Sequence, residues 1–202
     1  QRSSNPLPEN VADDRYYSHY LVRRLAAEVA LDAYSQVTGV PTPFTQVRSN
    51  AGDALENTAN YPLGTRAMQL PDSLVASQFL DAFGRPDRTQ TCSCERQQDS
   101  SVTQALHLNN GSTLNDKLRA PNSRVEQWLA EKVSDDEAIS RVFQLALARK
   151  PSDSERQKLA AIFAEAAKES APDEKAALEA RRLMMQDLFW AVLTDREFLF
   201  NH

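Results

Sequence analysis

The side chains best suited to chemistry in this chain are its two cysteines, Cys92 and Cys94, which are separated by a single serine. Two thiolates at this spacing can bind one zinc or other borderline metal ion. The candidates for further ligands are His107, His19, Glu95 and Asp99. The pair could instead cycle between dithiol and disulfide, although a bond between them would close a small strained ring. Structural zinc sites usually place two or more residues between cysteines, so we favour buried or locally paired thiols.

Charged side chains surround the two cysteines. Arg85, Arg88 and Arg96 can present guanidinium groups to a carboxylate, sulfate or phosphate, and Glu95 lies in the same stretch. The alternative is an internal network of ion pairs that fixes the loop. We favour the internal network because Asp81 and other nearby carboxylates already supply the anions.

His107 lies between Leu106 and Leu108 in a short apolar segment. This setting favours a hydrogen-bonded core histidine over a metal ligand or general base. The sequence contains no nucleophile elbow, no phosphate-binding glycine loop and no His-Glu-x-x-His helix. No catalytic motif is identified, so the sequence leaves open whether the chain is an enzyme. It assigns no cofactor beyond the zinc or other metal that the cysteines could bind.

The charge pattern excludes one class of partner. The chain holds 28 acidic and 23 basic residues, for a net charge of −5, and the basic residues occur in scattered pairs. A nucleic-acid-binding face needs a basic patch, so we expect no nucleic-acid partner. No apolar run approaches the roughly 18 residues of a membrane-spanning helix, so no transmembrane segment is expected. Because the chain begins at Gln1, we expect it to continue upstream in a longer polypeptide.

The elements that position these side chains are predicted to be helices joined by long loops. Prolines and polar residues predict an extended arm over residues 1–20, and a first helix follows over residues 21–37. Residues 40–72 hold four prolines and keep no apolar period, which predicts a long loop. Asp72 is expected to cap the helix that precedes the Cys-x-Cys loop of residues 83–100.

The second half of the chain predicts helices with short connections. Ser101 opens one short helix, and Leu114 and Leu118 suit another. Apolar residues then recur at three- and four-residue steps over residues 122–132, 135–149, 153–169 and 173–193. Ser/Thr-x-x-Glu boxes predict helix starts at Ser134, Ser152 and Thr194. No segment alternates with strand period, so the predicted fold is all-α: an irregular multi-helix bundle with long ordered loops, forming one domain over residues 1–202.

A set of short strings carries a family resemblance. They are Tyr17-Ser-His-Tyr20, Arg23-Arg24-Leu-Ala-Ala-Glu28-Val29, Gln36-Val-Thr-Gly39, Phe83-Gly-Arg-Pro86, Cys92-x-Cys94-Glu95-Arg96, Gln104-Ala-Leu-His107-Leu-Asn109 and Asp195-Arg-Glu-Phe-Leu-Phe-Asn201-His202. Together and in this order they resemble the C-terminal domain of large exported planctomycete-type proteins. Those proteins often carry a planctomycete-type cytochrome c domain and an uncharacterised partner domain upstream. The resemblance covers nearly the whole chain.

The resemblance implies a location more than a reaction. It implies an exported protein, periplasmic or at the cell surface, in which this chain is the C-terminal portion. Haem would belong to a separate upstream domain of the family. The resemblance assigns no activity to the present domain.

The sequence supports a leading hypothesis and two alternatives. The leading hypothesis is a non-catalytic binding or scaffolding module of an exported multidomain protein. Its partners would be the upstream domains of the same polypeptide, another protein or a glycan, and Arg85, Arg88, Glu95 and Arg96 would form the recognition surface. One alternative is a metal-binding or thiol redox accessory module centred on Cys92 and Cys94, with His107 nearby. The other is a component of carbohydrate processing.

Overall fold

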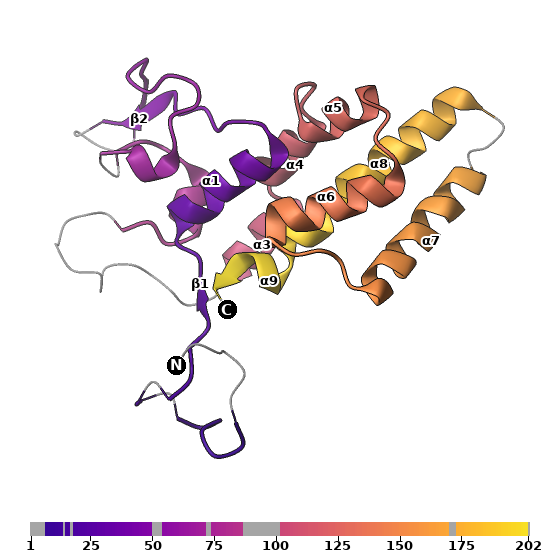
Figure 1. Cartoon of the computed structure of the whole chain (residues 1–202). Helices are drawn as coiled ribbons and strands as arrows, with labels where there is room; N and C mark the ends of the chain where they lie inside the picture. Colours follow the sequence, from indigo (N-terminus) through magenta and orange to yellow (C-terminus); the bar gives the residue numbers. More distant parts are fainter. Residues whose placement is uncertain are drawn as a thin grey trace.

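The computed structural model describes residues 7–13, 15–16, 18–49, 54–71, 74–86, 102–169 and 173–201. Over these residues the fold is mostly helical, as the apolar periodicity predicts (Figure 1). The helices fall into an N-terminal lobe and a C-terminal helical body. We use these two names throughout.

The helical body is arranged around one long helix, α8 (Glu174–Thr194). This helix packs against α4 (Ser112–Arg119), α5 (Arg124–Ala130), α6 (Asp135–Leu147), α7 (Asp153–Glu169) and α9 (Arg196–Leu199). The four longer helices predicted for this half agree with α5 to α8 to within two residues at each end. The apolar stripes of α5, α6 and α7 pack against α8, as in other helix bundles.

Side-chain caps explain where the helices of the body begin. The Ser134 hydroxyl accepts a hydrogen bond from the Glu137 N–H at 3.3 Å. Ser152 and Glu155 form a complete capping box, in which each side chain accepts a hydrogen bond from the other residue's N–H. Both predicted caps are confirmed. The third is wrong, because α9 is capped by the carboxylate of Asp195 and not by a Thr194 box.

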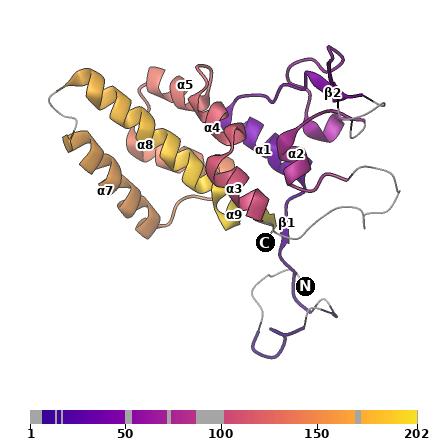
Figure 2. The ribbon, with the colours of Figure 1, turned by 180° about the vertical axis from the view of Figure 1, so that it is seen from behind.

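The N-terminal lobe contains α1 (Ala27–Thr38), α2 (Gln78–Ala82) and α3 (Val102–Asn110). It also contains the 3₁₀ helix η1 (Ala67–Gln69) and the antiparallel pair β2 (Gln46–Arg48) and β3 (Leu55–Asn57). Two views from opposite sides place this hairpin at the far end of the molecule from α7 (Figures 1 and 2). The segment predicted as a structureless loop over residues 40–72 therefore includes short strands and a helical turn.

A second small sheet joins the segment before α1 to the C-terminal end of the described chain. Strand β1 (Arg23–Arg24) pairs with β4 (Phe200–Asn201) in antiparallel register, and the Leu25 N–H donates to the Leu199 carbonyl at 2.8 Å. The predicted first helix begins at Ala27 instead of residue 21 because the preceding residues belong to this sheet. The sequence predicts no strands, and this prediction is wrong at two places, the β1–β4 pair and the β2–β3 pair.

The helix before the Cys-x-Cys loop is shorter than predicted. Val75 forms an isolated β-bridge with Val47, so the backbone there is extended. The helix begins only after Ser77, whose hydroxyl accepts a hydrogen bond from the Leu80 N–H at 3.3 Å. Asp72 itself lies outside the described residues. The predicted helix start at Asp72 is nevertheless wrong, because the helix is capped by Ser77 and the strand pairing before it overrides the local signal.

The two parts share one hydrophobic core. Tyr34 of α1 is fully buried, and its ring stacks on Phe198 of α9 with centroids 5.6 Å apart. The same ring meets Phe79 of α2 edge-on at 5.5 Å. Its hydroxyl donates to the Leu193 carbonyl at 3.3 Å. Helix α1 is therefore fixed against the body and can serve as a rigid wall for a site.

Candidate functional site

A cleft of about 610 Å³ opens along α1. We call it the α1 cleft. One wall comes from α1 and the turn after it, and the other comes from the segment before and within η1. The lining residues are Val29, Asp32, Ala33, Ser35, Gln36, Gly39, Pro41, Thr42, Gly64, Thr65, Arg66 and Met68.

Asp32 holds the two walls of the α1 cleft together. Its carboxylate accepts hydrogen bonds from the N–H groups of Ala67 at 2.6 Å and Met68 at 3.2 Å. These are the first N–H groups of η1, which have no partner within the helical turn itself. A side chain of α1 thus caps a helical turn 35 residues further along the chain. The separation of the walls is therefore fixed by direct bonds.

The turn after α1 shapes the end of the cleft. Gly39 has a φ of +76°, in the left-handed region that glycine adopts without strain, and it ends the helix. Arg124 of α5 donates to the last carbonyls of α1, through Nε to Val37 at 2.9 Å and through Nη2 to Gln36 at 3.1 Å. A cation at this end also suits the negative pole of the helix dipole.

A buried lysine lies behind the Ser35 side of the cleft. Lys117 of α4 is only 6% exposed, and its Nζ donates to the Val40 carbonyl at 2.7 Å and to Ser35 Oγ at 3.1 Å. Ser35 Oγ also lies 3.0 Å from Thr42 Oγ1 and can donate to the Leu31 carbonyl at 3.0 Å. The ammonium is thus connected to the cleft through one serine hydroxyl.

Burial changes the acidity of this lysine. Removal of the ammonium from water lowers the pKa of Lys117 to about 8, and the negative charge of Asp32 acts in the opposite direction. A pKa near 8 leaves roughly a tenth of the side chain neutral at pH 7, since the pKa lies about one unit above that pH. A neutral amine in contact with a serine hydroxyl can accept its proton.

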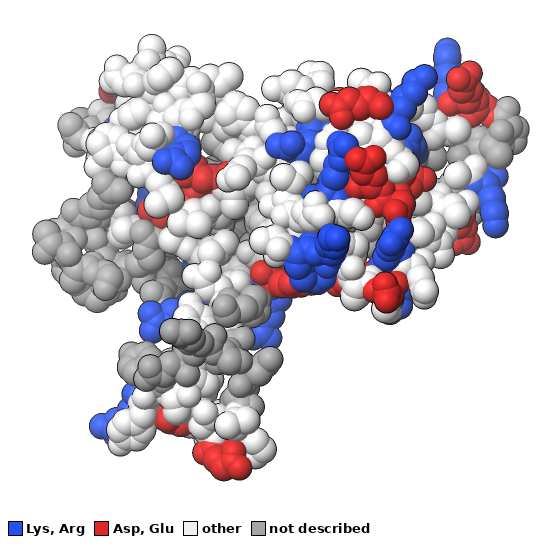
Figure 3. Space-filling model, in the orientation of Figure 1, with Lys and Arg blue, Asp and Glu red and all other residues white. Residues whose placement is uncertain are grey.

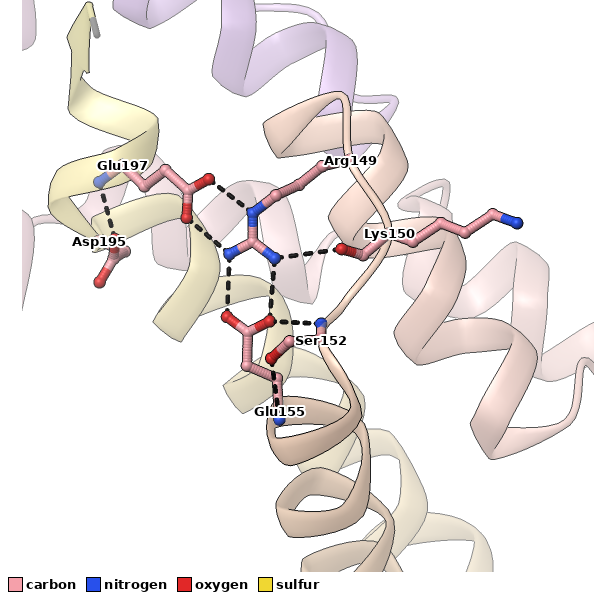
Figure 4. A network of polar contacts seen from close by, with 6 residues as sticks. All are labelled: Arg149, Lys150, Ser152, Glu155, Asp195 and Glu197. Atoms are coloured by element: carbon pink, nitrogen blue, oxygen red, sulfur yellow. Dashed lines mark hydrogen bonds and ion pairs between the residues drawn. The ribbon is translucent and has the colours of Figure 1, made fainter. Parts of the chain in front are cut away.

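A second polar cluster links the ends of three helices of the body (Figure 4). Arg149, just after α6, donates to both oxygens of Glu197 at 2.6 and 2.7 Å and to both oxygens of Glu155 at 2.9 Å. Its remaining N–H donates to the Lys150 carbonyl at 3.1 Å. A guanidinium has five N–H donors, so each one is used here. We call this cluster the Arg149 node.

The Arg149 node is a structural clamp. The bonds to Glu197 and Glu155 raise the pKa of Arg149, and the bonds from Arg149 and Ser152 lower the pKa of Glu155 to about 2. Both partners are therefore charged throughout the ordinary pH range. A mostly apolar groove of about 300 Å³ lies beside the node, between Phe143, Leu159 and Leu188. The guanidinium has no donor left for a ligand in that groove.

Most of the residues predicted from the sequence as a site lie outside the described residues. These are Cys92, Cys94, Arg88, Glu95 and Arg96. Arg85 is described, and its side chain is 4% exposed. It donates to the Val75 carbonyl and to the Asp81 carboxylate, both at 2.8 Å. Arg85 thus contacts protein groups of its own lobe.

His107 of α3 has the surroundings of a core histidine. Its Nε2 lies 3.1 Å from the Thr113 hydroxyl, and its ring meets Phe79 and Phe83 edge-on. Burial lowers the pKa of His107, so the neutral ring is favoured. Across the parts of the chain that the structure describes, no group of three or more His, Cys, Asp or Glu side chains could hold a metal ion.

The charges visible on the surface are unevenly distributed. Figure 3 shows acidic and basic side chains gathered over the half that holds α5 to α8, and few over the half that holds the hairpin. Many of the charges on the body are paired, as in Arg156 with Asp136 and Arg181 with Asp135. None of the described helices has both the length and the apolar character needed to cross a membrane.

Sequence reasoning missed Lys117 and Ser35. One signal for Lys117 was present, because it follows Leu114 by three residues and directly precedes Leu118, so a charge lies on the apolar stripe of α4. Ser35 carries no comparable signal. Its contact with Lys117 joins positions 82 residues apart in the sequence and depends on the packing of α4 against α1.

Comparison with known proteins places the chain in a family. No curated protein and no solved structure matches it. A family model does match, over residues 1–163, and its description is PSD1, protein of unknown function (DUF1553). The match covers most of the 202 residues, including the α1 cleft and Lys117. The chain therefore belongs to the PSD1 family of proteins of unknown function.

Proposed function

We propose that this chain is a binding module and that the α1 cleft holds its ligand. The observation that carries the proposal is the construction of the cleft. Its walls are joined by the Asp32 hydrogen bonds, and one of them is a helix fixed in the core through Tyr34. A cleft with fixed walls loses little conformational entropy when a ligand enters, which favours binding.

The lining favours a neutral ligand that carries several hydroxyl groups, such as a sugar. Ser35, Thr42 and Thr65 offer hydroxyls, and Gln36 offers an amide. These groups both donate and accept hydrogen bonds, as a polyol requires. Apolar side chains between them suit the C–H faces of a sugar ring: Val29, Ala33, Pro41 and Met68. A glycan is thus the ligand class that we propose.

The wider context is also a proposal. We infer that the module belongs to an exported multidomain protein, periplasmic or at the cell surface, whose upstream domains include a cytochrome c domain in some members. The sequence segments that resemble the C-terminal domain of exported planctomycete-type proteins support this inference. A scaffolding role toward those domains or another protein, and a metal-binding or thiol redox role for Cys92 and Cys94, stay as alternatives.

A matched pair of variants tests the binding function. Gln36→Trp places a large side chain at the mouth of the α1 cleft, whereas Gln157→Trp makes the same change on the exposed surface of α7. The purified chain is screened on an array of mono- and oligosaccharides, and hits are measured by calorimetry. We expect binding by the wild type and by Gln157→Trp, and at least about tenfold weaker binding by Gln36→Trp, or about 1.4 kcal/mol.

Two results would contradict the proposal. Equal affinity of Gln36→Trp and the wild type would place the ligand elsewhere on the molecule. Failure of every sugar on the array to bind the wild type would exclude the proposed ligand class. Circular dichroism of both variants verifies that neither change alters the helical content.

A further inference from the structure

The Ser35 hydroxyl occupies an unusual position among the lining groups of the α1 cleft. It is the contact through which a buried ammonium reaches the cleft, with Lys117 Nζ 3.1 Å away. Thr42 Oγ1 lies 3.0 Å from the same oxygen, and the Leu31 carbonyl is 3.0 Å away. The oxygen thus has a proton donor on one side and alternative acceptors on the others.

The protonation state of Lys117 decides what this hydroxyl can do. When the amine is protonated, it donates to Ser35 Oγ, and the serine proton is directed to Leu31 or Thr42. When the amine is neutral, its lone pair can accept the serine proton. No carboxylate contacts Nζ among the described residues, so no ion pair holds the amine in its charged form. A weak nucleophile next to a general base is the usual arrangement for covalent catalysis.

We propose that Ser35 is a nucleophile toward esters, with Lys117 as its general base, and that the α1 cleft takes acyl esters of hydroxylated compounds. Pairs of serine and lysine are known to replace the serine–histidine arrangement in acyl transfer. The substrate class rests on the proposed function, because an acylated sugar is an ester of the ligand class that we assign to the cleft. The pairing of Ser35 and Lys117 does not depend on that ligand.

The reaction proceeds in two balanced steps. Ser35 Oγ adds to the ester carbonyl carbon while Lys117 Nζ takes the serine proton. The bond from carbon to the alcohol oxygen then breaks, its electron pair leaves with that oxygen, and Lys117 returns the proton to it. The products are the free alcohol and an ester of Ser35. Water next adds to the Ser35 ester by the same proton transfers, which releases the carboxylic acid and restores the hydroxyl.

The geometry assigns the supporting roles. Thr42 lies within hydrogen-bond distance of Ser35 Oγ and orients it. The hydrogen bond from Nζ to the Val40 carbonyl at 2.7 Å holds the amine in place, so that Ser35 and Lys117 stay in contact. Both walls of the cleft are rigid, which keeps the reacting groups in one arrangement. Asp32 is the carboxylate whose charge acts on the amine.

Active-site labelling tests the proposal directly. The purified chain is treated with a fluorophosphonate probe, which reacts covalently with activated serines, and the labelled peptide is identified by mass spectrometry. We expect labelling of Ser35 in the wild type and in Ser154→Ala, which removes an exposed hydroxyl of α7 outside the cleft. Labelling should be lost in Ser35→Ala and slowed at least about tenfold in Lys117→Arg, because an arginine cannot act as a base.

A second measurement keeps the role of Lys117 open to test if Lys117→Arg does not fold. The labelling rate of the wild type should rise with pH, with a midpoint near the pKa of about 8. A rate that is independent of pH between 6 and 10 would overturn the role of Lys117 as a base, and so would equal labelling of a folded Lys117→Arg.

The outcomes separate this proposal from the binding function. Sugar binding in the α1 cleft without labelling of Ser35 would overturn the nucleophile and leave the binding function intact. Labelling of Ser35 without sugar binding would support the nucleophile and exclude the proposed ligand class. Labelling at a different serine would also overturn the assignment of Ser35.

Discussion

Two cationic side chains, Arg149 and Lys117, join helices of this fold, and they differ in the groups that they bond to. In the helical body, Arg149 has two carboxylate partners and uses every N–H it has. Where the body meets the N-terminal lobe, Lys117 of α4 donates to the Ser35 hydroxyl of α1 and to the Val40 carbonyl just after α1, and no described carboxylate is bonded to it. The first cation has its charge compensated, and its pKa is raised. The second is desolvated, the charge of Asp32 offsets this only in part, and its pKa is lowered to about 8.

This difference in partners and pKa distinguishes a purely structural cation from one that can take part in a reaction. A cation whose pKa lies far above 7 and whose donors are all occupied can only hold elements together. A lysine that titrates near neutral pH and contacts a hydroxyl in a cleft can also transfer a proton. We therefore propose that any chemistry of this chain takes place in the α1 cleft and not at the Arg149 node, although the node has more hydrogen bonds.

The largest predicted effect tests whether the two parts are one folding unit. Tyr34→Ala removes a fully buried ring that α1 packs against Phe79 and Phe198, and we expect a loss of about 3–5 kcal/mol in the free energy of unfolding. Both tryptophans of the chain, Trp128 and Trp190, lie in the body. Their fluorescence during urea unfolding should nevertheless report the whole loss, because the core is shared.

The control for this change is Tyr34→Phe. It removes only the hydroxyl that donates to the Leu193 carbonyl, and it should cost about 1 kcal/mol. A tryptophan transition that stays at the wild-type urea concentration in Tyr34→Ala would show that the body unfolds independently. The comparison between the two regions would then concern two separate domains.

The second prediction concerns the pH dependence of stability. The pKa of Lys117 is about 8 in the folded chain and about 10.5 in the unfolded one, so between these values the unfolded state binds more protons. Stability must therefore rise with pH in this window. Each pH unit contributes at most about 1.4 kcal/mol, or roughly 2–3 kcal/mol between pH 8 and pH 10. Urea unfolding at pH 8, 9 and 10 measures it.

Lys117→Met is the matched control because it removes the amine and keeps a side chain of similar length. Its stability should lack the rise between pH 8 and pH 10 that the wild type shows. The range stops at pH 10 because burial raises the pKa of Tyr34, which makes stability fall once the unfolded tyrosine loses its proton. An identical pH profile for both proteins would show that Lys117 is not the desolvated cation we describe.

The third and smallest prediction concerns the Arg149 node. Arg149→Ala leaves Glu155 and Glu197 without their common partner, and we expect a loss of about 1–2 kcal/mol. The estimate is modest because about a third of each side chain is exposed and water screens the charges. The loss should shrink at high salt, since screening weakens exposed ion pairs. Thermal unfolding at low and high salt measures it.

Arg156→Ala provides the comparison for Arg149. Arg156 makes a similar pair with Asp136, but its side chain is 54% exposed and it has one carboxylate partner in place of two. Its loss should cost less than about 0.5 kcal/mol. Equal losses in the free energy of unfolding for both substitutions would show that the Arg149 node stabilises the fold no more than an ordinary surface ion pair does.

The sequence predicts the helical body well. Apolar residues such as Ile139, Val142 and Phe143 recur at helical spacing, and the caps at Ser134 and Ser152 lie within a few residues of the helices that they begin. Such signals are local, so one sequence contains them completely. Helix boundaries are accurate where caps and apolar periods agree.

The N-terminal lobe is predicted poorly because its structure depends on distant contacts. The strand at Arg23 exists only because Asn201 pairs with it, and Val75 is extended because Val47 lies beside it. The pair of Ser35 and Lys117 cannot be predicted from the sequence for the same reason. Ser35 becomes notable only when α4 brings Lys117 to it, and neither residue belongs to a catalytic motif that can be read from the sequence.

The most direct test of the account is the pKa of Lys117 in the full chain. Lysine labelled with ¹³C at the ε carbon is titrated by NMR, and the signal of Lys117 is assigned by its absence in Lys117→Met. We predict a midpoint near 8, well below the ordinary value of 10.5. A midpoint at or above 10.5 would contradict the account, because a fully charged amine could not take the proton of Ser35.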